Sequence, residues 1–242
     1  MTGTIWAPPA YIESLQIQGL PIDFKADMPI LGELFDQDVS IVDDWIDESA
    51  EHAKIAFAAA TTEWLAWRLD GVAPDADMHE LAQALWAAMV DIRYWKGERR
   101  LQPDGGSAVD WISYSAWQEA EALMRMSLKR KGKARNVVNL VLLARHVLPK
   151  SAHAGLKAWL TAVLRERVGA LWQLDDDPRV RDERLGPLVS REALDPAQPL
   201  DEAAVSGQVD ALLRGIDWKN NRYLRSPDEL AAIGFSGTPY TL

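Results

Sequence analysis

Residues 137–148 read VVNLVLLARHVL and decide the fold class of the chain. Their apolar side chains surround a helix axis on nearly every side, with Asn139 and His146 among the few interruptions. A helix of this kind is surrounded by other helices in a protein outside the membrane. The stretch is also far shorter than the roughly 18 apolar residues that a membrane span needs. We therefore expect it to form the centre of a helical bundle.

Three segments before this stretch also repeat apolar residues at helical spacing. The first runs from about residue 38 to Gly71 and predicts one long amphipathic helix. The other two cover residues 81–92 and 112–124, with the DGGS stretch at residues 104–107 as a loop between them. Gly132 is expected to end the last of these helices. Three helices are thus expected before the central one.

The chain after the central stretch continues as helix with one long interruption. Pro149 ends the central helix, Ser151 can cap the next one, and an amphipathic stripe then covers residues 156–171. Residues 175–199 are rich in proline and aspartate, which predicts a long connection with one turn near Arg191. We expect this connection to be draped over the core or to have a functional role.

Both ends of the chain are expected to be ordered. Prolines and glycines interrupt residues 1–36, which predicts an arm with at most short elements. Apolar spacing over residues 205–216 predicts a further helix. In RSPDELAAIGF, residues 225–235, Ser226 is placed as an N-cap and Glu229 completes a capping box. A short helix with such complete caps indicates a docked tail.

Length and composition favour a single domain. The 242 residues are 48% apolar, which is enough for one large core. We expect an all-α fold, a compact multi-helix bundle of about six to seven helices over residues 1–242. Its parts would be the N-terminal arm at 1–36, a helical core at 38–174, the connection at 175–199, and a C-terminal helix with a docked tail at 200–242.

The chain contains no cysteine. This excludes a disulfide framework, a thiolate metal site and a cysteine nucleophile, and it is typical of chains that fold in a reducing compartment. The first basic residue is Lys25, and Pro8 and Pro9 interrupt the first residues, so they do not resemble a secretory signal. We predict a cytoplasmic protein that does not span a membrane.

Charge is distributed unevenly along the chain, although its net value is −10. Residues 1–91 carry 17 acids and 3 bases, residues 92–174 carry 6 acids and 15 bases, and residues 175–242 carry 13 acids and 8 bases. The net negative charge argues against general nucleic-acid binding, which gains its affinity by neutralising phosphates. The alternation predicts a surface polarised between an acidic first third and a basic middle.

The most concentrated acidic motif is DDWIDESAEH, residues 43–52. Its DDxxD spacing resembles the motif with which class I terpene synthases and prenyltransferases hold magnesium against a diphosphate. Carboxylates suit Mg²⁺ because this ion prefers hard oxygen ligands. The candidate magnesium ligands are Asp43, Asp44, Asp47, Glu48 and Glu51. They define an alternative function, a small all-α Mg-dependent enzyme that acts on a phosphate or diphosphate substrate.

Helical geometry turns this acidic motif away from the core. At 100° per residue the five acids cover a sector of about 140°, and the apolar residues of the segment lie roughly opposite. Charges on such a face usually contact solvent. Pairing Glu48-x-x-Glu51 with Asp77-x-x-Glu80 is similar to the acidic pairs of all-α nucleotide pyrophosphohydrolases, but the second pair is in reversed order. We therefore expect a solvated or partner-docking acidic face and no cofactor.

The most basic motif is KRKGKAR, residues 129–135, at a predicted helix junction. It can be a solvated junction, or it can receive phosphate or an acidic peptide. Nucleic acid is the weakest of these readings, because no aromatic residue interleaves the run. The candidate partner-binding residues of the basic motif and the acidic face are Lys129, Arg130, Lys131, Lys133, Arg135, Asp43, Asp47 and Glu51.

Two further features concern ligands and aromatic surfaces. Arg135, Asn139 and His146 form a thin polar stripe, within about 40° by helical counting. If the stripe faces a cavity, Asn139 and His146 could bind a small polar ligand, with His146 as acid or base; otherwise it is the exposed edge of the helix.

Most of the eleven tryptophans fall in apolar stripes and predict core packing. Trp111 lies opposite its stripe and is a candidate partner contact.

These features together favour binding over catalysis. We expect a non-enzymatic helical interaction protein, of the adaptor, immunity or dedicated-chaperone type, that binds a protein partner through its charged faces. A homo-oligomer is also open, in which the acidic first helix of one copy meets the basic junction of another. The Mg-dependent enzyme remains the alternative.

Overall fold

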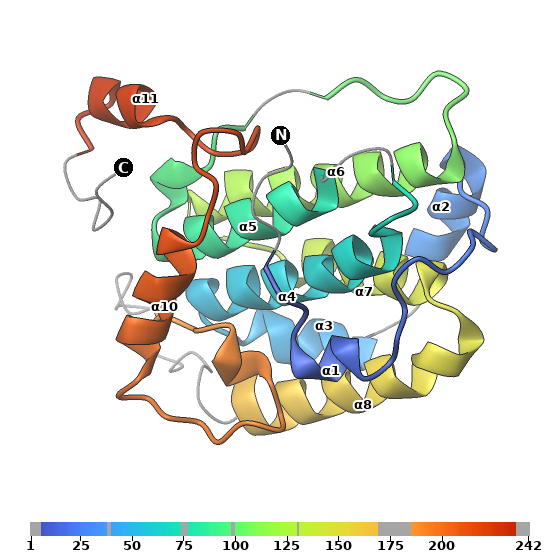
Figure 1. Ribbon diagram of the computed structural model, residues 1–242, viewed down its shortest axis with the longest axis horizontal. Coiled ribbons are helices and arrows are strands. Elements are labelled where there is room, and N and C mark those ends of the chain that lie inside the picture. The colour runs from blue at the N-terminus through green and yellow to red at the C-terminus, as the bar shows by residue number, and fades with distance from the viewer. Residues whose placement is uncertain are drawn as a thin grey trace.

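The computed structural model describes residues 6–37, 40–73, 77–97, 100–129, 131–168 and 185–235, apart from the side chains of Ser40, Ile41, Asp43 and Val168. Over these ranges the fold is an all-α bundle, as predicted (Figure 1). The main helices are α3 (Ser40–Asp47), α4 (Glu51–Leu69), α5 (Asp77–Val90), α6 (Ala108–Ser127), α7 (Ala134–Val147), α8 (His153–Ala162) and α10 (Val205–Arg214). Three short helices belong to the arm and the tail: α1 (Ala10–Glu13), α2 (Met28–Phe35) and α11 (Pro227–Ala232). Within the described part of the chain, no helix is both long and apolar enough to cross a membrane.

Helix α4 is the centre of the bundle (Figure 1). Of its 19 residues 18 are buried, and it packs against α5, α6 and α7. Its middle is rich in alanine, and small side chains allow the neighbouring helices to approach closely. The prediction that residues 137–148 form the centre is wrong. They lie in and just after α7, which is buried on most of its surface but packs beside α4.

The predicted long helix over residues 38–71 is also wrong, because residues 48–50 divide it into α3 and α4. Ser49 is fully buried, and its hydroxyl donates a hydrogen bond to the carbonyl of Ile46 at 2.7 Å. A serine that bonds a preceding carbonyl in this way competes with the helical pattern. Ala50 is extended, with ψ at 157°, and α4 then begins at Glu51. Angles counted along one continuous helix therefore do not place Glu51.

Two buried charges of α4 attach the outer segments to the bundle. Arg68 donates hydrogen bonds to the carbonyls of Leu20 and Pro21 in the N-terminal arm, at 2.8 and 2.7 Å. Glu63 accepts from Arg191 of the long connection, at 2.6 Å for the shortest contact. Because buried charges need partners, these contacts fix the arm and the connection against α4.

The segments that follow α7 agree with the sequence only in part. Ser151 does not cap α8: a 3₁₀ turn, η2 (Lys150–Ala152), comes first, and the N-cap Ala152 offers no side-chain hydrogen bond. After Ala162 the chain widens into a π-helical segment, η3 (Val163–Val168). The rest of the predicted stripe and the first part of the connection, residues 169–184, lie outside the described residues. The turn predicted near Arg191 is confirmed as η5 (Glu192–Leu194).

The C-terminal tail has the predicted caps. The hydroxyl of Ser226 accepts the backbone N–H of Glu229 at 3.2 Å, and the carboxylate of Glu229 accepts the backbone N–H of Ser226 at 2.7 Å. This capping box opens α11, and the buried side chains of Leu230 and Phe235 dock it against the bundle. The tail is therefore ordered by local capping and by burial together.

Candidate functional site

The turn between α6 and α7, residues 128–133, presents the basic motif at the surface; we call it the basic turn. Lys129, Lys131 and Lys133 are exposed, and none of their side chains forms an ion pair or side-chain hydrogen bond with another described residue. Arg130, predicted to be part of the same surface, lies outside the described residues. Three positive charges thus face solvent within five residues of chain.

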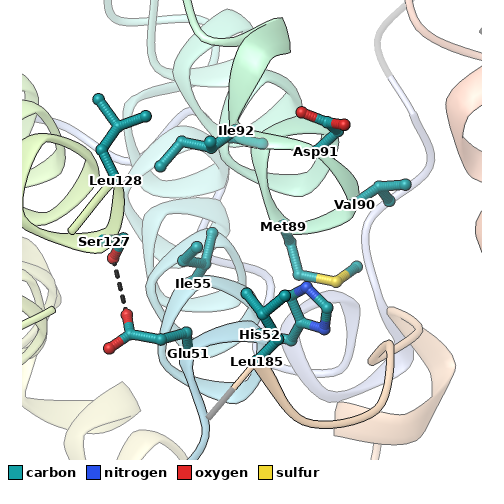
Figure 2. A pocket seen from close by; sticks show the side chains of 11 residues that line it. Glu51, His52, Ile55, Met89, Val90, Asp91, Ile92, Ser127, Leu128 and Leu185 are labelled. Carbon is teal, nitrogen blue, oxygen red and sulfur yellow. Dashed lines mark hydrogen bonds between the residues drawn. The ribbon is translucent and has the colours of Figure 1, made fainter. Parts of the chain in front are cut away.

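The acidic segment holds this turn from inside. The carboxylate of Glu51 is buried and accepts the backbone N–H of Gly132 at 3.1 Å. Its second oxygen accepts the hydroxyl of Ser127 at 3.0 Å, as Figure 2 shows. One helix turn earlier in the chain, Asp47 accepts the backbone N–H of Ala134 at 3.1 Å, at the start of α7. The acidic and basic motifs therefore meet within one chain, through backbone N–H groups and not through lysine side chains.

Gly132 is required at its position because of this close approach. A Cβ atom there would lie 2.6 Å from a carboxylate oxygen of Glu51 and 2.7 Å from the hydroxyl of Ser127. Contacts below 3.0 Å force neighbouring atoms to shift. The sequence pattern identified Gly132 only as the end of a helix. Helix α6 in fact ends at Ser127, and Gly132 is the residue that lets the turn sit on the buried acid.

The other acidic candidates divide between surface and interior. Asp44, Asp47 and Glu48 are exposed, whereas the side chain of Asp43 lies outside those described. Glu51 is only 4% exposed, so its predicted place on an open docking face is wrong. The reason is the break at residues 48–50, which moves Glu51 to the start of the central helix.

The geometry does not assemble the predicted magnesium ligands. Among the side chains that the structure describes, no three acids or histidines are grouped closely enough to share a metal ion. Glu51 is engaged by Gly132 and Ser127, and the acid of the proposed second pair, Asp77, binds Arg100 at 2.7 Å and the hydroxyl of Tyr223. The two acidic pairs therefore belong to separate clusters, and these residues do not fit a shared cofactor.

The residues of the polar stripe on α7 contact different parts of the protein. Asn139 is 8% exposed and lies beside Glu119 on α6. The carboxylate of Glu119 accepts the amide of Asn136 at 2.8 Å, and Oδ1 of Asn139 has no hydrogen-bond partner among the described residues. His146 bonds the carbonyl of Lys25 in the N-terminal arm at 2.7 Å. Asn139 and His146 therefore do not face one ligand, as the sequence allowed. Arg135 reaches the carbonyl of Gln37 at 3.4 Å and belongs to this arm contact.

The tryptophans pack mainly in the core, as predicted. Their indole nitrogens often bond across elements: Trp86 to Glu63 at 2.7 Å, for example, and Trp159 to the carbonyl of Leu194 at 2.9 Å. Trp111, a predicted partner contact, is partly buried against the core and lies edge-on to Tyr114, with ring centroids 6.4 Å apart. This packing gives Trp111 a structural role.

A hollow of about 240 Å³ lies beside the basic turn, and sequence reasoning missed it. Figure 2 shows the side chains that line it, among them the apolar Ile55, Met89, Ile92 and Leu128. Leu128, the first residue of the basic turn, is 62% exposed. An apolar hollow with an exposed leucine at its rim is a surface that a partner can cover.

His52 is the titratable group of this hollow. Its Nδ1 lies 2.8 Å from the carbonyl of Gly186, which can only accept, so Nδ1 carries the proton. Burial lowers the pKa of His52 from its ordinary value of 6.5, which favours the neutral imidazole. Figure 2 shows the ring beside Met89, away from the bonded pair of Glu51 and Ser127. These side chains do not form a nucleophile with an adjacent base.

Comparison with known proteins finds no family model, curated protein or solved structure that matches this chain. The geometry of the chain itself must therefore support any function.

Proposed function

We propose that this chain is a non-enzymatic binding protein that docks an acidic segment of a partner protein on the basic turn. The observation that supports this most directly is the set of unpaired lysines, Lys129, Lys131 and Lys133, on a turn that is held by buried contacts. Lysines that no described acid neutralises are available to carboxylates of a partner. Such complementarity mainly speeds and specifies association.

The bracing of the turn by Glu51 supports binding over a purely solvated junction. A turn already fixed in one conformation loses less conformational entropy when a partner binds. Glu51 bonds Ser127 just before the turn and the N–H of Gly132 within it, and Asp47 bonds the N–H of Ala134 just after it. The lysine-bearing segment is therefore held on both sides. Among the described residues, the carboxylates of Glu51 and Asp47 bond backbone N–H groups and the hydroxyl of Ser127, and the lysine side chains face outward.

The adjacent hollow defines a second element of the partner. Leu128 joins the lysines to the apolar lining at Ile55 and Met89. An apolar side chain that follows the acidic residues of the partner would be buried there. We therefore propose a partner segment that combines several carboxylates with one aliphatic or aromatic residue, because apolar anchors supply affinity while charges supply specificity.

The contacts of Asp47 and Glu51 argue against a homo-oligomer in which the acidic helix of one copy binds the basic junction of another. Asp47 and Glu51, which would provide the acidic face, already bond the basic turn of their own chain. We therefore favour a different protein as the partner. Native mass spectrometry at low salt should give a monomeric mass; a dimer that dissociates with added salt would favour the homo-oligomer instead.

The direct test is quantitative affinity capture from the native cell with the tagged chain as bait. The variant Lys129→Gln/Lys131→Gln/Lys133→Gln should capture at least about tenfold less of the stoichiometric protein partner, because three charge pairs with it are removed. A charge-matched control, Lys157→Gln/Arg165→Gln/Lys219→Gln, removes three exposed cations elsewhere and should retain it. Leu128→Ser should weaken capture without any change in charge.

The outcomes are distinguishable. A partner retained equally by both triple variants would contradict docking on the basic turn. Capture that disappears after nuclease treatment would identify nucleic acid and would also contradict the proposal. With the purified partner, the association rate should fall as ionic strength rises, because exposed charges are screened over about 8 to 10 Å at physiological salt.

A further inference from the structure

A second hollow, of about 450 Å³, lies between the N-terminal arm, the end of α7 and the start of α8. Its described lining includes five basic residues from these three parts of the chain: Lys25, Arg145, His146, Lys150 and His153. None of the described residues of the basic turn line this hollow. This hollow is therefore independent of the proposed partner surface.

The exposed cations of this hollow have no acidic partner among the residues that the structure describes. Lys25, Arg145 and Lys150 are exposed and form no side-chain ion pair or hydrogen bond with another described residue. Asp23 is the one carboxylate among the described lining residues, and it lies 3.5 Å from the buried guanidinium of Arg68. The charge of Asp23 is thus already balanced, and the three cations leave a net positive hollow.

The helix dipole of α7 accounts for only some of the basic residues around this hollow. Arg145 and His146 lie in the last turn of α7, where cations favour the helix dipole. Lys25 comes from the arm, and Lys150 and His153 follow Pro149 in the next elements, where no such benefit exists. Like charges repel, so their convergence costs free energy unless an anion is present.

Each of the two histidines contacts a backbone carbonyl through one of its ring nitrogens. Nε2 of His146 lies 2.7 Å from the carbonyl of Lys25, and Nε2 of His153 lies 3.0 Å from the carbonyl of Leu148. A carbonyl can only accept, so each Nε2 carries a proton and each Nδ1 is the nitrogen left for a ligand.

The lining of the hollow also has an apolar part. The side chains of Leu34, Leu142 and Leu148 are buried in its lining, and Phe24 stands at its side, edge-on to His146 with ring centroids 6.0 Å apart. Ligand pockets of a few hundred Å³ commonly combine such apolar walls with a few polar groups that fix orientation. The apolar side chains suit the hydrocarbon part of a small molecule, and the cations suit an anionic group on it.

We propose that this hollow binds a small organic phosphate, with the dianionic head at Arg145, Lys150 and Lys25 and an apolar or aromatic body against Phe24. A dianion matches the rim because three unpaired cations face it. His146 and His153 line the same hollow beside these cations. The apolar walls distinguish this ligand from inorganic phosphate.

The test is calorimetric titration of the full chain with phenyl phosphate, inorganic phosphate and benzyl alcohol. Phenyl phosphate should bind most tightly, with inorganic phosphate at least about fivefold weaker because it leaves the walls uncovered, and benzyl alcohol weaker still. The variant Arg145→Gln/Lys150→Gln should weaken phenyl phosphate at least about tenfold. The control Lys157→Gln/Lys219→Gln removes two exposed cations outside the hollow and should leave binding unchanged.

Amide chemical shifts separate this site from general charge effects. Phenyl phosphate should shift the signals of Phe24, His146 and His153 and leave those of the basic turn in place. Absence of binding by phenyl phosphate, equal affinity in the two double variants, or shifts confined to the basic turn would each overturn the proposal. The partner-capture experiment does not use these residues, so the failure of either proposal leaves the other open to its own test.

Discussion

Glu51 accepts the backbone N–H of Gly132 at 3.1 Å, so a buried acid of the N-terminal third fixes the middle of the basic turn. The two residues are 81 positions apart in the chain. The acid is 4% exposed and also bonds Ser127, which gives the turn a buried anchor. The stability of this contact can be measured separately from any binding.

Replacement of Glu51 should destabilise the fold in proportion to the hydrogen bonds lost. Glu51→Ala leaves the N–H of Gly132 and the hydroxyl of Ser127 without their acceptor, which should cost about 2 to 4 kcal/mol. Glu51→Gln keeps one carbonyl oxygen and should cost less than Glu51→Ala. The free energy of unfolding in urea measures both, and an effect of Glu51→Ala below about 0.5 kcal/mol would contradict a buried anchor.

Gly132→Ala should destabilise the chain by about 1 to 3 kcal/mol, because its Cβ would lie 2.6 Å from Glu51. Gly207→Ala is the matched control. Gly207 lies inside α10 with open space around its Cβ position, so alanine there should stabilise the helix by about 0.5 to 1 kcal/mol. Thermal denaturation of the two variants should therefore shift in opposite directions. Equal shifts would show that Gly132 is not sterically required.

The buried pair of Glu63 and Arg191 should show strong coupling. Arg191→Leu leaves the carboxylate of Glu63 buried without its cation and should cost about 3 to 5 kcal/mol. Adding Glu63→Gln removes that charge but keeps an acceptor for the indole of Trp86. The double variant should thus be more stable than Arg191→Leu alone. A double-mutant cycle by urea denaturation measures the coupling, and simple additivity would contradict it.

Stability should fall as the pH drops through the histidine range. Burial lowers the pKa of His52 and of His79 from the ordinary value of 6.5, so the unfolded chain binds these protons more readily than the folded one. Their contribution is present above pH 6.5 and is lost as the pH falls toward the lowered pKa values.

The variant His52→Asn tests this pH dependence, since its amide can still donate to the carbonyl of Gly186 but does not titrate. The free energy of unfolding between pH 7.5 and 5 should vary less in His52→Asn than in the unmodified chain. His153→Asn is the comparison, because it removes a histidine outside this hollow. An unchanged slope in His52→Asn would contradict a buried neutral imidazole.

The secondary structure was largely predictable from local pattern. Apolar spacing indicated helices α5 to α8 and α10, and the residues Ser226 and Glu229 predicted the caps of α11, since caps form between residues three apart. The absence of other strong periodicities likewise indicated short elements in the arm. Helical spacing and caps depend on residues close together in the chain, so they can be predicted from the sequence.

The break at residues 48–50 was not predictable from that pattern. Ser49 occupies a helical gap equally well in a continuous helix, and only its burial and its bond to Ile46 show that the helix ends there. For the same reason the position of Glu51 was misjudged. A helical count places side chains around one axis and gives no information across a change of axis.

The order of residues along the chain is sufficient to predict that it forms helices, where most of them lie, and that acidic and basic residues are segregated. Which helix is central and which acids are buried depends on how the helices pack. The same is true of the contacts through which Glu51 and Asp47 hold the basic turn while its lysines face outward. The same holds for the cationic hollow, whose basic residues come from three parts of the chain. Helix formation depends on neighbours within about four residues, whereas burial and charge pairing depend on contacts between residues far apart in the chain.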